Sequence, residues 1–161
     1  MQDNAIDLTK LMEAFPNLRD LSFKDLKLHF TEVPENKLVT FHVTAIDYDR
    51  NEGDFNVIKF IEKTKLKSFF FFGDVQMNTE MPEKLSADTI ENLGLYLPVG
   101  RESEFLNLFP NLVSLQTDES SLFNLKKEDF DRLKKFYVTR NEWYDFEYVK
   151  DKISPQLKKV C

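Results

Sequence analysis

Four consecutive phenylalanines, at positions 69 to 72, restrict the fold of this chain more than any other stretch. Successive side chains of a β-strand point to opposite faces of the sheet, so four rings in a row cannot all enter one core. If Leu66, Phe69 and Phe71 face the core, then Phe70 and Phe72 face the other side. The stretch therefore predicts a strand whose outer face is aromatic. The rings on that face remain exposed to water unless a partner covers them.

A recurring spacing of apolar residues places this strand within a series. Phe-Pro-Asn-Leu occurs twice, at 15–18 and 109–112. The leucine of each copy is position 1 of a frame in which positions 1, 4 and 6 are expected to face the core. Apolar frames that recur with a period of roughly 20 to 29 residues are typical of repeat arrays, in which a short strand alternates with a crossover segment. Six frames share this register, and they start at Leu18, Leu38, Leu66, Ile90, Leu112 and Leu133.

The crossovers between the expected strands have apolar residues at helical spacing. Helices are expected over 7–15, 54–63, 101–108 and 126–133. In the first, Asp7 is a candidate N-cap and Phe15 shares the apolar face, whereas Glu102 and Glu104 of the third are expected to point outward. Tight Asn-Gly or Asp-Gly hairpin turns do not occur in the sequence. The prediction is an α/β fold with about six parallel strands on a concave side and helices or turns on a convex side.

These six frames resemble the leucine-rich repeats of irregular length in ribonuclease-inhibitor-like proteins and in the substrate-receptor arms of F-box proteins. The resemblance covers roughly residues 8–140 and implies a short, irregular solenoid that binds proteins. The family usually carries Asn or Cys three residues after the position-6 residue. Only Asn141 matches here, and the sequence contains no F-box. The other five positions hold Leu26, Ile46, Asp74, Pro98 and Ser120.

The expected organisation is a single domain spanning 1–161. Residues 1–17 form an N-terminal helix or cap, 18–140 form the repeats, and 141–161 form a C-terminal cap or tail. A repeat array exposes its last apolar layer, so Trp143, Phe146 and Val149 are expected to cover it. The alternative is that Trp143 and Tyr144 are an exposed interaction site. The first helix either covers the other end or is the trailing half of an upstream repeat.

The concave face is the expected binding surface. Its centre is aromatic and its ends are polar, which is the anatomy of a protein interface. Gly94 is expected to leave a dent beside the aromatic rings, whereas His29 falls in a loop. Two alternatives remain open: a loop or the tail folds over this face, or the frame slips by one residue and exchanges the two faces. The candidate partner-binding residues are Phe70, Phe72, Tyr96, His42, Tyr137 and Gln116.

Catalytic, metal-binding and cofactor-binding motifs are not expected. Ser68, His42 and Asp20 could be imagined as a nucleophile set, but nothing nearby resembles a nucleophile elbow. The acidic stretch at 47–54 lacks the spacing of an EF-hand. The single cysteine, Cys161, can form no internal disulfide. We therefore expect a chain that is not an enzyme and holds no metal or cofactor.

Composition narrows the choice of partner. The net charge of −6, together with only two lysines on the expected concave face, disfavours nucleic acid. No apolar run is long enough to span a membrane, and the start lacks a signal-peptide pattern. An intracellular location, in cytoplasm or nucleus, is expected. The partner is therefore another protein or a peptide, and the alternative function is structural self-association into a homodimer or higher homo-oligomer.

Overall fold

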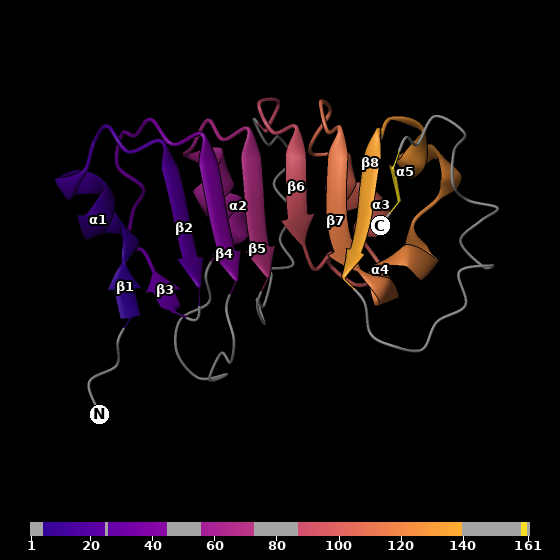
Figure 1. The fold of residues 1–161 in the computed structure, drawn as a ribbon, viewed down its shortest axis with the longest axis horizontal. Coiled ribbons are helices and arrows are strands. Elements are labelled where there is room, and N and C mark those ends of the chain that lie inside the picture. The colour runs from indigo at the N-terminus through magenta and orange to yellow at the C-terminus, as the bar shows by residue number, and fades with distance from the viewer. Residues whose placement is uncertain (1–4, 25, 45–55, 73–86, 140–158, 161) are drawn as a thin grey trace.

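The computed structural model describes residues 5–24, 26–44, 56–72, 87–139 and 159–160, which form parallel strands joined by short helices (Figure 1). The strands are β1 (Ala5–Asp7), β2 (Asp20–Lys24), β3 (Lys27–His29), β4 (Thr40–Thr44), β5 (Ser68–Phe72), β6 (Asn92–Leu95), β7 (Ser114–Asp118), β8 (Lys135–Thr139) and β9 (Lys159–Val160). The helices are α1 (Leu8–Ala14), α2 (Val57–Glu62), α3 (Glu102–Leu106), α4 (Glu119–Asn124) and α5 (Lys127–Asp131).

Seven parallel strands make the main sheet, in the order β2-β4-β5-β6-β7-β8-β9. All six expected frames fall on strands, and these six lie side by side in chain order. The register is level across the sheet, because Phe41 lies opposite Phe69, Phe69 opposite Leu93, and Leu93 opposite Leu115. The prediction of an α/β fold built on about six parallel strands is confirmed.

The same pattern of two backbone hydrogen bonds links each pair of neighbouring strands from β2 through β8, just before the strands begin. The Arg19 carbonyl accepts from the backbone N–H groups of Val39 (2.7 Å) and Thr40 (3.0 Å). The carbonyls of Val39, Lys67, Glu91 and Val113 each accept in the same way from two consecutive N–H groups of the following unit. These bonds extend the ladder one residue ahead of each strand and hold neighbouring strands in level register.

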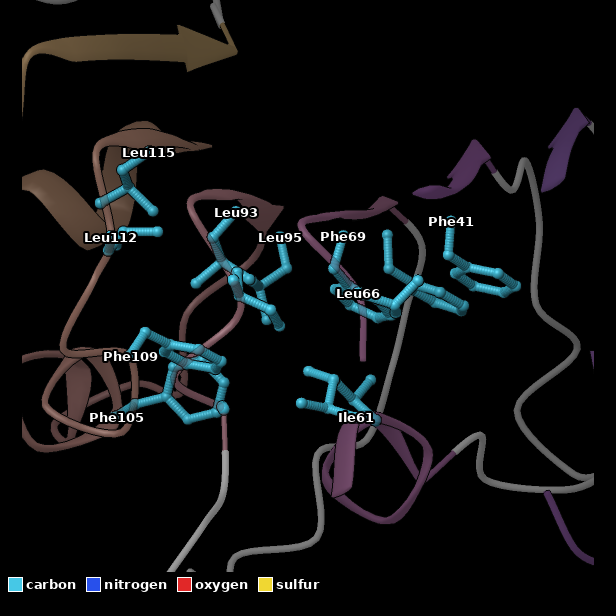
Figure 2. Close-up of a cluster of buried hydrophobic side chains, with 14 of the residues drawn as sticks. Phe41, Ile61, Leu66, Phe69, Leu93, Leu95, Phe105, Phe109, Leu112 and Leu115 are labelled. Carbon is cyan, nitrogen blue, oxygen red and sulfur yellow. The ribbon is translucent and has the colours of Figure 1, made fainter. Parts of the chain in front are cut away.

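The core lies on one face of the sheet only. Phe41, Phe69, Leu93, Leu115 and Phe136 are fully buried there. Figure 2 shows the labelled strand residues extending toward the same side as the helical residues Ile61 and Phe105. Fully buried rings from the helices complete this core, and they come from Phe60, Phe105 and Phe130.

Helix α1 begins as the sequence predicts, but its end differs. Asp7 is the N-cap, and its carboxylate accepts from the Lys10 backbone N–H at 3.2 Å. Phe15, expected on the apolar face, is 58% exposed, because it is the C-cap residue and has left the helix. Phe109, at the same place in the second Phe-Pro-Asn-Leu copy, is fully buried with its ring centroid 5.2 Å from that of Phe105.

Two further expectations are wrong. His29 belongs to β3, which pairs in parallel with β1 in a separate two-stranded sheet, rather than to a loop. Glu102 is only 3% exposed and does not point outward. Its carboxylate accepts from the Asn124 amide at 2.8 Å, so it links α3 to α4, a helix that the sequence did not predict. The neighbouring buried carboxylate of Asp129 accepts from the Ser103 hydroxyl at 2.6 Å.

The C-terminal cap assigned to Trp143, Phe146 and Val149 lies outside the described residues, as does Tyr144. So does the acidic stretch at 47–54. Strand β9 forms one edge of the main sheet. Its residues Lys159 and Val160 pair with Lys135 and Phe136 of β8.

Candidate functional site

The face of the main sheet opposite the core is called the open face here. In Figure 1, α2 and α3 lie behind the strands, and no helix of the described ranges lies in front of them. The open face therefore belongs to the side chains that alternate with the core residues along β2 and β4 to β8.

Strand β5 settles which phenylalanines face the core. Phe69 and Phe71 are 0% and 1% exposed, whereas Phe70 and Phe72 are half-buried. Strand β4 alternates in the same way, with His42 exposed between two fully buried residues. A slip of one residue would reverse these values, so the expected assignment of the two faces is confirmed.

Four side chains form an aromatic cluster on the open face: His42, Phe70, Phe72 and Tyr96. The His42 and Phe70 ring centroids are 5.4 Å apart, from directly opposed positions on β4 and β5. Phe72 and Tyr96 meet edge to face with centroids 5.6 Å apart, a favoured aromatic geometry. Tyr96 is 45% exposed, so the cluster presents an uncovered ring surface.

Gly94 does not leave the dent that the sequence predicts. A Cβ atom at this position would lie 2.3 Å from Cδ1 of Phe70 and 3.1 Å from Cε2 of Phe72. The Phe70 ring therefore lies directly over the Gly94 backbone and fills the space. The absence of a side chain at Gly94 allows this close contact between the ring and the backbone.

Gln116 and Tyr137 continue the surface beyond the cluster. Gly94 lies opposite Gln116, and Gln116 lies opposite Tyr137, so the row crosses β6, β7 and β8. Both side chains are half-buried. All six candidate residues named from the sequence thus lie on the open face or, for Tyr96, immediately after β6 at its carboxyl-terminal edge.

Polar groups flank the aromatic cluster. At the amino-terminal edge, the Asn92 amide donates to the Ser68 hydroxyl at 3.0 Å. At the carboxyl-terminal edge, Asp118 ends β7 and accepts from the hydroxyls of Ser120 and Ser121. Burial would raise the pKa of Asp118, but these hydrogen bonds outweigh it and lower the pKa below its ordinary value.

The sequence reasoning did not single out Asp118 as a site residue. The sequence does carry a signal for a helix start at this position, because Asp is a favoured N-cap residue. In the structure, Asp118 is the N-cap of α4.

Ser68, His42 and Asp20, the imagined nucleophile set, come from three neighbouring strands. Asp20 and Ser68 both lie opposite Thr40 from the two neighbouring strands, and His42 is two residues further along β4. Within the described ranges, no hydrogen bond joins Ser68, His42 and Asp20. No three His, Cys, Asp or Glu side chains of the described residues gather to hold a metal. Across the same ranges, none of the helices has the length and apolar character needed to cross a bilayer.

Gly94→Ala should displace the Phe70 ring from the sheet, because the new methyl group and the ring cannot share the space. Labelling of Phe70 by hydroxyl radicals should rise, with a loss of about 1 kcal/mol in the free energy of unfolding. Gly100→Ala is the matched control: its φ of 78° strains any other residue by about 1–2 kcal/mol, but its Cβ touches nothing. Equal Phe70 labelling in wild type and Gly94→Ala would contradict the described packing.

Comparisons with known proteins give no family assignment. No protein-family model matches the chain. No curated protein and no solved structure matches it either.

Proposed function

We propose that this chain is a non-catalytic interaction module that binds another protein or a peptide through the open face. One observation carries the proposal: Phe70, Phe72 and Tyr96 present ring surface to solvent although the opposite face already has a complete core. Parallel sheets usually have both faces covered, and aromatic residues on a face that no helix covers are typical of a protein interface.

The proposal extends to the type of fold. Strands that recur in chain order, a level register and helices on one side of the sheet support a short leucine-rich-repeat solenoid of irregular repeat length. Such an array displays an extended sheet to a partner. A substrate-recognition or scaffold arm of a larger assembly is the role that fits this proposal.

The free energy of docking would come from a small number of contacts at the centre of the open face. Phe70 and Phe72 are already half-buried, so docking would remove only their remaining surface from water, worth about 1 kcal/mol each by area. Contacts to Tyr96 and the polar flanks would add to this. The aromatic cluster would then act as the apolar centre of the interface, with Ser68, Asn92 and Asp118 on its rim.

Affinity capture with the purified chain tests the proposal. A specific partner should be retained by the wild type and lost from the Phe70→Ala/Phe72→Ala variant, with the variant still folded. Partners retained equally by both would contradict a role for the open face.

Sedimentation of the chain alone separates this function from self-association. A monomer at micromolar concentration is expected. A stable dimer that the same double substitution dissociates would assign the open face to a second copy instead.

A further inference from the structure

The four central strands of the open face carry a single formal charge. Their described open-face positions hold polar or aromatic residues and one glycine, and the only ionised group among them is the carboxylate of Asp118. The other charged open-face residues whose side chains the structure describes are Asp20 and Lys24 of β2 and Lys135 of β8. Those central positions are Thr40, His42, Thr44, Ser68, Phe70, Phe72, Asn92, Gly94, Ser114, Gln116 and Asp118.

Asp118 and the exposed ring of Tyr96 lie at the same carboxyl-terminal edge of the sheet, at the ends of neighbouring strands. Gly94 of β6 lies directly opposite Gln116 of β7. Tyr96 follows Gly94 by two residues, and Asp118 follows Gln116 by two residues. Adjacent strands are about 4.8 Å apart, so the ring and the carboxylate occupy one edge of the sheet within reach of a single side chain. Phe72 supports Tyr96 from the other side through its edge-to-face contact.

Neutral hydroxyl groups hold the Asp118 carboxylate in place. Ser120 and Ser121 donate their hydroxyls to it, and both donors are neutral. No lysine or arginine of the described residues forms an ion pair with Asp118. Its lowered pKa keeps it ionised at neutral pH. A positioned anion beside an exposed aromatic ring is an arrangement that recognises a cation, because the ring face and the carboxylate both attract positive charge.

We propose, resting on the function above, that the bound segment carries a basic side chain, arginine or lysine, which lies against Tyr96 and pairs with Asp118. An apolar side chain of the same segment would occupy the surface over Phe70 and Phe72. The net charge of −6 favours encounter with a basic partner and disfavours an acidic one. The occupant is therefore a basic, partly apolar peptide segment of another protein.

Random-sequence peptides displayed on phage test this directly, with the full chain as bait. Peptides selected by the wild type and rejected by Phe70→Ala/Phe72→Ala should be enriched in arginine or lysine next to an apolar residue. Asp118→Asn keeps the shape of the side chain and should lower affinity for such a peptide about tenfold. Asp131→Asn removes the same charge from an exposed position of α5, outside the open face, and should leave affinity unchanged. Circular dichroism confirms that each variant is folded.

The outcomes separate the two proposals. Selected peptides that need Phe70 and Phe72 but show no basic enrichment, or that bind Asp118→Asn as tightly as wild type, would overturn the basic-segment proposal and leave the docking function standing. If no selected peptide depends on Phe70 and Phe72, the docking function fails and the basic-segment proposal fails with it. Equal losses of affinity from Asp118→Asn and Asp131→Asn would show a general charge effect and also overturn the basic-segment proposal.

Discussion

Phe69→Ala should lower the free energy of unfolding by about 3–5 kcal/mol, the cost of emptying a fully buried phenylalanine site. The Phe69 ring is 0% exposed and stacks between those of Phe41 and Phe71, at centroid distances of 5.6 and 6.3 Å. The Phe60 ring of α2 lies 6.4 Å away, so the cavity would open between sheet and helix. Chemical denaturation followed by circular dichroism measures the loss.

The adjacent residue provides the control for this prediction. Phe70→Ala removes the same atoms from the same strand, but its ring rests on the open face and contributes mainly through cross-strand contacts. These are worth about 1 kcal/mol. If Phe70→Ala destabilises the chain as much as Phe69→Ala, the two faces of the sheet do not differ in the way described.

Phe70→Ala/Phe72→Ala should weaken partner binding about a hundredfold, the loss expected when the central residues of an interface are truncated. Phe70 covers Gly94 and contacts His42, and Phe72 supports Tyr96, so the double substitution removes the centre of the aromatic cluster. Titration calorimetry with the captured partner measures the change. Unfolding measured in parallel should show a loss no larger than about 2 kcal/mol.

Phe15→Ala is the matched control for binding. Phe15 is 58% exposed, more than any residue of the aromatic cluster with a stated exposure, but it lies at the end of α1 and not on the open face. Its substitution should leave affinity unchanged. A comparable loss of affinity from Phe15→Ala would place the partner at α1 instead of the open face.

The strand positions and their two faces were predictable because they depend on local alternation. Phe69 and Phe71 are buried and Phe70 and Phe72 are not, for the reason that the period of two requires. The recurrence of this pattern at similar spacing was enough to indicate parallel strands in chain order. The placement of His42 and Tyr96 on the open face follows from the same rule.

Other features depend on neighbours that the local pattern does not specify. Phe15 and Phe109 share a four-residue motif, but only Phe109 has helix α3 and its Phe105 ring to pack against. Glu102 reads as a surface residue until α4 brings Asn124 to it. The dent expected at Gly94 is absent because the ring opposite it was free to fill the space.

Hydroxyl-radical footprinting of the chain, free and with its captured partner, tests the central claim most directly, because it reports the exposure of each ring in the chain without any substitution. Labelling of Phe72 and Tyr96 should fall sharply in the complex, while labelling of Phe15 stays the same. Unchanged labelling of Phe72 and Tyr96 in a complex that protects other residues would contradict the open face as the docking surface.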